Sequence, residues 1–280
     1  MIDEVVMLRH GRTSFNLNRR LQGQIDVPLD IIGQWQVDQS GFELAQRYYW
    51  AKIGNVARNP QLLAQPGPGA ARRSDIGEYR AAPASRRRMA VVSSDLFRAQ
   101  QTAHAFADSL GLPVELDARL RERSFGQWEG MTREEIREMD PQAYDSWRRH
   151  EGGELAYGVE SREATGKRGA DAMRSIVTDP KYADEPTTLM VVGHGSWIAA
   201  TIETLIGMDI DGLDNLGGVR NGFWSRLSVA HKLNGASVDA PIWQLDAFNE
   251  APPIARLVDW ENGPEDLRTP GAPLWKPFGL

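Results

Sequence analysis

Two apolar runs, at residues 5–8 and 188–192, each lead into a histidine that is followed by glycine. A short apolar run bounded by glycine predicts a buried β-strand, here followed by a helical segment. His10 and His194 therefore stand at the carboxyl ends of two predicted strands. Because ligands of α/β proteins bind in the crevice at the carboxyl ends of the strands, we expect the two histidines to share one pocket.

Arg9 stands immediately before His10, and Gly11 follows it. A lone histidine after a strand is more often structural than catalytic, so neither histidine is sufficient evidence by itself. The neighbouring arginine changes the interpretation, because a guanidinium binds two oxygens of an anion while an imidazole serves as nucleophile or proton carrier. Gly11 would let an anion approach the backbone closely. This combination predicts a phosphate site.

Two further segments carry groups that phosphoryl transfer requires. The apolar run 89–92 is followed by SSDLFRAQQTA at residues 93–103, which places Arg98 in the first turn of a predicted helix. The sequence RLRERSFGQWEG at residues 119–130 holds Glu122 among arginines, as a candidate proton donor. The segment after the first motif offers neutral donors to phosphate oxygens at Asn16, Gln22 and Gly23.

Four motifs together resemble the histidine phosphatase superfamily, in its phosphoglycerate mutase-like branch. RHG, SSDLxRAxxTA, LRExxFGxWEG and GHG occur in that order between residue 5 and about residue 207, interrupted by one insertion. The resemblance implies that His10 is the phosphorylated nucleophile and that Glu122 is the acid and base. It also implies a phosphate pocket formed by Arg9, Arg98 and His194, with Asn16 nearby. The remaining candidates for substrate binding are Gln22, Gly23 and Gly195.

This set of residues suits the hydrolysis of phosphate monoesters. A phosphate dianion resists attack, so the site must neutralise its oxygens, align the nucleophile with the leaving oxygen and protonate the departing alkoxide. His10 can attack only if its other ring nitrogen donates a hydrogen bond, which we expect a backbone carbonyl to accept. Glu122 would protonate the alcohol and afterwards activate water. Neither step calls for a metal ion or a cofactor.

The four motifs are compatible with three functions. The protein could be a phosphatase, a phosphoglycerate mutase or a non-catalytic binder of phosphorylated metabolites or of a protein partner. A mutase needs a closed, dry site with extra basic contacts, and no arginine-rich, multi-proline segment follows the Glu122 motif. A pure binder needs neither a nucleophile nor an acid. A phosphatase acting on a small phosphorylated metabolite is therefore favoured. Residues 216–224 and 243–249 are similar to the carboxyl-terminal part of glucosyl-3-phosphoglycerate phosphatases, which suggests a sugar phosphoglycerate as substrate.

Composition limits the partners, the metal sites and the cellular location that we expect for this protein. The chain has 280 residues, of which 41% are hydrophobic and 25% charged, and a net charge of -6, which disfavours nucleic acid as a partner. It has no cysteine, so disulfides and thiolate metal sites are excluded. No apolar run approaches the ~20 residues of a membrane helix, and the first residues lack a basic signal-peptide start. We expect a cytoplasmic enzyme, and a homodimer stays open as an alternative.

The predicted elements alternate between strands and helices, which indicates an α/β fold with a mainly parallel sheet covered by helices on both faces. Asp30 is the expected N-cap of a helix that reaches about Tyr49, and Gly111 ends a second helix over residues 98–110. Further short strands are expected at residues 114–116, 223–229 and 242–248, the last two as a hairpin.

The region 124–165 is expected to form a helical cap over the pocket. Thr132 and Glu135 form a capping box that opens a short helix there. Trp128 and Trp147 are expected to border the pocket, and substrate preference should reside in this region. The other histidines lack a comparable setting and are predicted to be structural or exposed: His104, His150 and His231.

We expect one catalytic domain over residues 1–250. Within it, residues 58–88 are rich in proline, glycine and arginine and are typical of a flexible basic insertion. Such a connection lies opposite the catalytic edge of the sheet, so we assign it no catalytic role. Residues 251–280 form a tail rich in proline and glycine, whose aromatic side chains either dock on a protein surface or belong to a frayed end: Trp260, Trp275 and Phe278.

Overall fold

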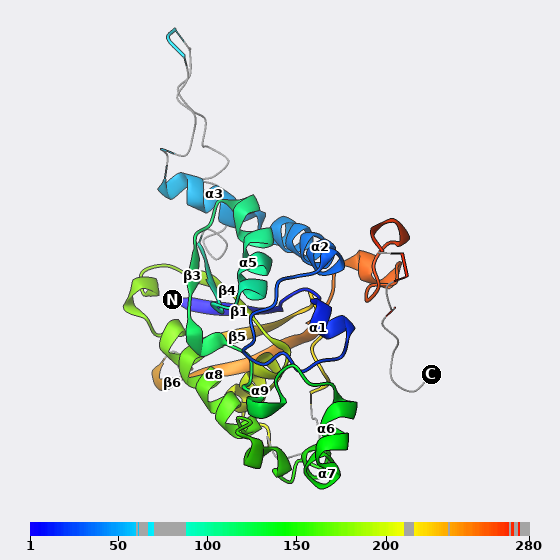
Figure 1. Cartoon of the computed structure of the whole chain (residues 1–280). Helices are drawn as coiled ribbons and strands as arrows, with labels where there is room; N and C mark the ends of the chain where they lie inside the picture. Colours follow the sequence, from blue (N-terminus) through cyan, green and yellow to red (C-terminus); the bar gives the residue numbers. More distant parts are fainter. Residues whose placement is uncertain are drawn as a thin grey trace.

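The computed structural model describes residues 1–59, 61, 67–69, 88–209, 216–234, 236–268, 270, 271 and 274. Its centre is a six-stranded sheet with the strand order β3-β2-β4-β1-β5-β6 (Figure 1). The strands are β1 (Ile2–Arg9), β2 (Met89–Ser93), β3 (Val114–Leu116), β4 (Thr187–Gly193), β5 (Trp224–Leu233) and β6 (Ala236–Glu250). Within the described ranges, no helix is long and apolar enough to cross a membrane.

Helices surround this sheet and extend beyond one end of it (Figure 1). The α-helices are α1 (Ser14–Leu17), α2 (Ile31–Arg47), α3 (Tyr49–Arg58), α5 (Phe97–Leu110), α6 (Arg133–Met139), α7 (Pro141–Arg148), α8 (Arg162–Val177) and α9 (Gly195–Ile206). The short 3-10 helices are η3 (Ala118–Leu120), η4 (Gly126–Trp128), η5 (Gly153–Tyr157), η6 (Pro180–Tyr182), η7 (Pro253–Arg256) and η8 (Glu265–Leu267).

Four neighbouring strands, β3, β2, β4 and β1, run parallel, whereas β5 and β6 add to β1 as an antiparallel hairpin. The predicted α/β fold with a mainly parallel sheet is therefore confirmed, and the expected hairpin forms its antiparallel edge. β1 and β4 are paired with Val5 opposite Leu189 and Arg9 opposite Gly193. Because of this register, the residues that follow the two strands leave the sheet side by side.

Successive side chains of β1 enter two different hydrophobic cores. Val5 and Met7 pack in the core shared with α8 and α9, whereas Val6 and Leu8 pack in the core shared with α2 and α5. A strand that is buried on both faces carries no alternating polar positions. This explains why the apolar run of β1 is uninterrupted and why helices cover both faces.

The helix boundaries follow the capping residues in the sequence. Asp30 Oδ1 accepts a hydrogen bond from Gly33 N at 2.7 Å and begins α2. α5 ends at Gly111, which has the left-handed φ of +64° that favours glycine. Both caps were predicted. The sequence did not mark α3, which follows α2 after only Tyr48.

The cap region has a small core of its own, which includes Phe125, Ile136 and Tyr144. The predicted capping box of Thr132 and Glu135 is present at the start of α6. Trp128 is fully buried in this core and packs edge-on against Trp147, with 5.4 Å between ring centroids. Trp128 therefore supports the cap and does not border the pocket, contrary to the prediction.

The chain after β6 returns to the body of the protein (Figure 1). Trp260 is 2% exposed and packs against Trp35 and Phe223. Of the two alternatives for this tail, docking on the body is the correct one for Trp260. Trp275 and Phe278 lie outside the described residues, as does most of the basic insertion at 58–88.

Candidate active site

The pairing of β1 with β4 brings the two histidines together, although 184 positions separate them in the sequence. His10 N donates to Gly193 O at 3.1 Å, and the centroids of the His10 and His194 rings lie 5.2 Å apart. Both side chains are buried. Burial, together with the positive charges of Arg98 and Arg9, holds the pKa of each histidine well below 6.5. Both rings are therefore neutral at pH 7.

The backbone sets the tautomer of His10. Its Nδ1 lies 2.7 Å from Gly11 O, and because a carbonyl only accepts, Nδ1 is the donor. The lone pair is then on Nε2, as attack on phosphorus requires. Gly11 is also required by packing, because a Cβ at this position would lie 2.4 Å from Gly33 O. It lets α2 pack closely against the loop that carries His10.

Two arginines, Arg98 and Arg9, flank the histidines. Arg98 is fully buried, and its Nη1 and Nη2 donate to Ile25 O and Gly23 O at 2.8 Å each. Gly23, expected to supply a donor to phosphate, also orients Arg98 through its carbonyl. Burial lowers the pKa of Arg98 to about 10, so the guanidinium stays charged at pH 7. Arg9 donates through Nη1 to Val219 O.

Three nitrogens of this cluster are buried and have no hydrogen-bond partner among the described residues: Arg9 Nε, Arg98 Nε and His194 Nδ1. His194 Nε2 lies 2.9 Å from Ser94 Oγ, which itself accepts from Leu96 N at 3.3 Å. This arrangement favours a Ser94 hydroxyl donating to Nε2, which leaves Nδ1–H of His194 as a donor. Because unsatisfied buried donors are costly, the three nitrogens together suit an anion.

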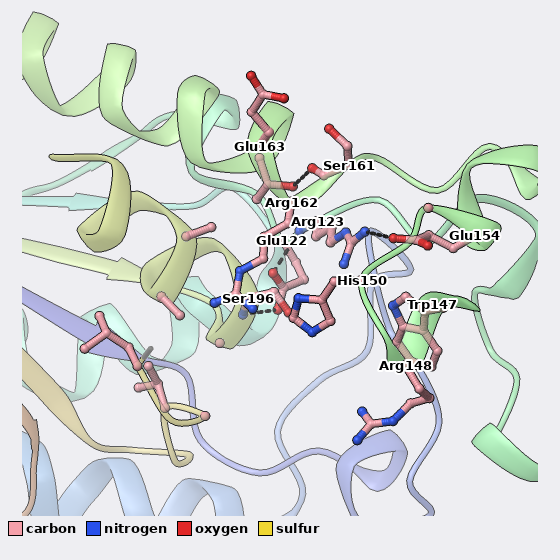
Figure 2. A pocket seen from close by; sticks show the side chains of 18 of the residues that line it. Glu122, Arg123, Trp147, Arg148, His150, Glu154, Ser161, Arg162, Glu163 and Ser196 are labelled. Atoms are coloured by element: carbon pink, nitrogen blue, oxygen red, sulfur yellow. Dashed lines mark hydrogen bonds and ion pairs between the residues drawn. The ribbon is translucent and has the colours of Figure 1, made fainter. Parts of the chain in front are cut away.

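Glu122 is held at the amino-terminal end of α9, next to the histidines. Its Oε1 accepts from Arg123 N at 2.8 Å and from Trp197 N at 2.9 Å, and its Oε2 accepts from Ser196 N at 3.1 Å. The first turn of α9, which begins directly after His194, thus fixes the carboxyl group. Figure 2 shows Glu122 beside Ser196 in the wall of a cavity.

The polar residues of α1 and the following loop are also oriented toward the site. Asn16 Oδ1 accepts from Thr13 N at 3.1 Å and from Asn221 Nδ2 at 3.3 Å. Its amide NH₂ is therefore the part that remains for a ligand. Gln22 accepts from Thr13 Oγ1 through Oε1 at 2.9 Å, which likewise leaves its NH₂ group.

Two adjoining cavities share part of their walls in this region. The smaller, of about 270 Å³, is lined by His10, Arg98, Asn16, Gln22 and Gly23. The larger, of about 850 Å³, extends under the cap and includes Gly195. The residues common to both walls are Arg9, Glu122, Arg133 and Ser196. Every candidate residue from the sequence except His194, whose ring packs beside His10, thus borders one of these cavities, and Glu122 stands where they join.

Several cavity residues carried no recognisable motif. His150, predicted to be structural or exposed, lines the larger cavity together with Trp147, as Figure 2 shows. Arg123 and Glu154 form a buried ion pair in the same wall. The remaining predictions for histidine agree with the structure, since His104 is exposed beside Asp108 and His231 binds Ile2 O at 2.7 Å.

The site lies at the carboxyl edge of an α/β sheet. It combines two arginines, a neutral histidine with a free ring nitrogen and a carboxyl group held in place, and this set defines an enzyme of phosphate ester chemistry. The chain belongs to the histidine phosphatase superfamily (branch 1), whose family profile matches residues 5–53 and 76–237. It is accordingly a phosphatase that acts on phosphate monoesters, as the sequence predicted.

Curated relatives support this assignment over nearly the whole chain. The glucosyl-3-phosphoglycerate phosphatase of Mycolicibacterium vanbaalenii is 32% identical over 263 residues, covering 92% of this chain and 99% of the relative. The enzyme of the same name from Mycobacterium tuberculosis is 30% identical, and the match covers 91% of this chain and 97% of the relative. A probable phosphoglycerate mutase of Yersinia enterocolitica is 30% identical but covers only 73% of this chain and 75% of the relative.

Solved structures show the same fold. The native structure of a mycobacterial glucosyl-3-phosphoglycerate phosphatase superposes with a TM-score of 0.65 at 28% identity, covering 89% of this chain and 99% of the other. A complex of that enzyme with VO3 gives a TM-score of 0.63 at 29% identity, and the match covers 89% of this chain and 100% of the other.

Proposed function

We propose that this protein hydrolyses the phosphate monoester of a sugar phosphoglycerate, of which glucosyl-3-phosphoglycerate is the type, through a phosphohistidine formed on His10. The observation that carries the proposal is the neutral His10 with its free Nε2, together with three buried nitrogens of Arg9, Arg98 and His194 that have no hydrogen-bond partner among the described residues. No metal ion is needed, because Arg9 and Arg98 supply fixed positive charge and His194 a further donor.

In the first step, Nε2 of His10 attacks phosphorus as the bond from phosphorus to the ester oxygen breaks. Arg9, Arg98 and His194 bind the equatorial oxygens, whose charge they stabilise in the transition state. Glu122, in its protonated form, transfers its proton to the departing alkoxide, which leaves as the alcohol. The products are phosphohistidine and a Glu122 carboxylate.

In the second step, water replaces the alcohol beside Glu122. The carboxylate accepts a proton from water as the oxygen attacks phosphorus and the phosphorus–nitrogen bond breaks. Inorganic phosphate leaves, and both His10 and Glu122 regain their starting protonation states. The two steps use the same proton carrier in opposite directions, which accounts for its position where the two cavities join.

The wider cavity favours a phosphatase over the alternatives. A mutase must protect its phosphohistidine from water, whereas a space of about 850 Å³ adjoins Glu122 here and leaves room for water and for a sugar. The relatives that cover nearly the whole chain are named as glucosyl-3-phosphoglycerate phosphatases. A non-catalytic binder would have no use for a carboxyl group held beside a neutral histidine. We treat residues 1–250 as one catalytic domain, with the cap 124–165 selecting the substrate.

The nucleophile is tested by measuring phosphate release from p-nitrophenyl phosphate and from glucosyl-3-phosphoglycerate in the presence of a chelator. His10→Ala should lower both rates on the order of 10⁴-fold or more, as expected for a lost nucleophile. His104→Ala, on the exposed face of α5, is the matched control. Enzyme denatured in alkaline detergent, in which phosphohistidine is stable, should carry the label of a radioactive phosphate ester on His10, and a label elsewhere would contradict the mechanism.

The acid is tested by comparing leaving groups. p-Nitrophenolate departs as a stabilised anion and needs little protonation, whereas an alkoxide needs a full proton. Glu122→Gln should therefore slow the sugar ester about 10²-fold or more and the nitrophenyl ester much less. Incubation with 3-phosphoglycerate and its bisphosphate tests the mutase alternative: accumulation of the isomer in place of free phosphate would overturn the proposal.

A further inference from the structure

One carboxylate in the wall of the larger cavity has an oxygen that the protein does not use. Glu154, in η5 of the cap, is 6% exposed, and its Oε1 accepts from Arg123 Nη2 at 2.8 Å (Figure 2). Its Oε2 is buried and has no hydrogen-bond partner in the part of the chain that the structure describes. Arg123 compensates the charge of Glu154, but it leaves this acceptor unsatisfied.

An unsatisfied acceptor at a buried position costs free energy unless a ligand supplies a donor. Glu154 borders a cavity that is large enough for a sugar and adjoins the candidate phosphate pocket. The donor that fits a carboxylate oxygen is a hydroxyl group, whereas a second phosphate or carboxylate would be repelled. Trp147 lines the same cavity and offers an aromatic surface of the kind that sugar rings contact.

Arg123 links this oxygen to the proposed chemistry. Its side chain is fixed at two points, by Glu154 Oε1 and by Glu160 O, which accepts from Nε at 2.5 Å. Its backbone N–H donates to Oε1 of Glu122 at 2.8 Å. One buried residue therefore sets the spacing between the proton donor and Glu154. A hydroxyl bound at Glu154 would place the ester oxygen of the same molecule at a fixed position relative to Glu122.

We propose that Glu154 is a specificity-determining residue whose Oε2 accepts a hydrogen bond from a hydroxyl group of the substrate's sugar. This inference rests on the proposed function and adds the residue that distinguishes a glycosylated phosphate ester from its sugar-free counterpart. Arg123 is the positioning residue that orients Glu154. The subsite selects polyhydroxylated leaving groups and rejects a second anion at the same place.

The test compares two substrates that differ only in the sugar: glucosyl-3-phosphoglycerate and 3-phosphoglycerate. Glu154→Gln keeps an oxygen for Arg123 but replaces the free acceptor with an NH₂ donor. The kcat/KM for the glucosylated substrate should fall about 10-fold to 100-fold, the range of a lost hydrogen bond to a charged group. The kcat/KM for 3-phosphoglycerate and for p-nitrophenyl phosphate should stay within about twofold. Glu134→Gln, on the exposed face of α6, is the matched control.

Three outcomes would overturn the inference. The first is an unchanged kcat/KM for the glucosylated substrate in Glu154→Gln. The second is an equal loss on all three substrates, which would show a structural role, with the thermal unfolding midpoint as the independent measure of folding. The third is a wild-type enzyme that does not prefer the glucosylated substrate. In that case, release of phosphate from p-nitrophenyl phosphate that depends on His10 would still support the proposed phosphatase chemistry.

Discussion

Asn221 donates through Nδ2 to the carbonyl oxygen of His10 at 2.9 Å, in a buried position, across 211 residues of sequence. The same amide group contacts Asn16 Oδ1 at 3.3 Å, and the carbonyl of Asn221 accepts from Trp260 Nε1 at 2.9 Å. The segment before β5 therefore joins His10, the proposed nucleophile, to Asn16 and to the carboxyl-terminal segment in one hydrogen-bonded chain.

Asn221→Ala should lower kcat with little change in KM. The substitution removes the donors to His10 O and Asn16 Oδ1, each worth about 1 kcal/mol, so kcat should fall roughly tenfold as His10 loses its fixed orientation. Steady-state kinetics with p-nitrophenyl phosphate give the measurement. Asn18→Ala, an exposed residue at the end of α1, is the control. An unchanged kcat would show that the loop holds His10 without this contact.

Gly195→Ala should impair catalysis more than folding. A Cβ at this position would lie 3.2 Å from both Cζ and Nε of Arg9, so the guanidinium must move by a few tenths of an ångström. Because a misplacement of about 1 Å costs on the order of 100-fold in rate, kcat should fall about threefold to tenfold. Gly67→Ala, whose Cβ would meet nothing within 4 Å, is the matched control. Loss of folding stability without loss of kcat would contradict this explanation.

Stability should depend on pH through the buried histidines. Burial and the nearby arginines lower the folded-state pKa of His10 and His194 below the unfolded value of 6.5. Below pH 6.5 the unfolded chain therefore binds protons that the folded protein does not. The free energy of unfolding should fall with decreasing pH, by about 1.4 kcal/mol per pH unit for each histidine until its folded pKa is reached.

Urea unfolding at a series of pH values from 7.5 to about 5 checks this prediction. His10→Gln should flatten the dependence by the contribution of one histidine, whereas His104→Gln, which replaces an exposed residue, should not. A dependence that is unaltered in His10→Gln would show that the pKa of His10 is the same in the folded and the unfolded protein, which contradicts this prediction. Catalysis should also persist in mildly acidic solution, because His10, the proposed nucleophile, stays neutral there.

Trp260→Ala should destabilise the protein by about 3–5 kcal/mol, the usual cost of removing a large buried aromatic side chain. The substitution removes packing against Trp35 and Phe223 and the hydrogen bond to Asn221 O. Leu257→Ala, at a position that is 82% exposed, should change stability by no more than about 0.5 kcal/mol. Equal stability of the two variants would mean that the docked segment does not contribute to the folded body.

The elements predicted from the sequence are those with a local physical cause. Apolar runs marked β1 and β4, Asp30 and Gly111 marked helix ends, and the Thr132 capping box marked α6. α3 was missed because no cap precedes it, and Trp128 was misplaced because its side chain packs inside the cap. The residues of the cavity wall, such as His150 and Glu154, were missed for a related reason: no local pattern separates them from other polar residues of the cap.

The sequence by itself determined the enzyme class and pointed to the histidines, arginines and carboxylate that the fold brings together. The strands carry their motifs at their carboxyl ends, and parallel pairing brings those ends together wherever the strands lie in the chain. The tertiary structure alone decided the free nitrogen of His10, the placement of Glu122 at α9 and the unused oxygen of Glu154. These features depend on contacts between backbone and side chains far apart in sequence, whose geometry exists only after the chain has folded.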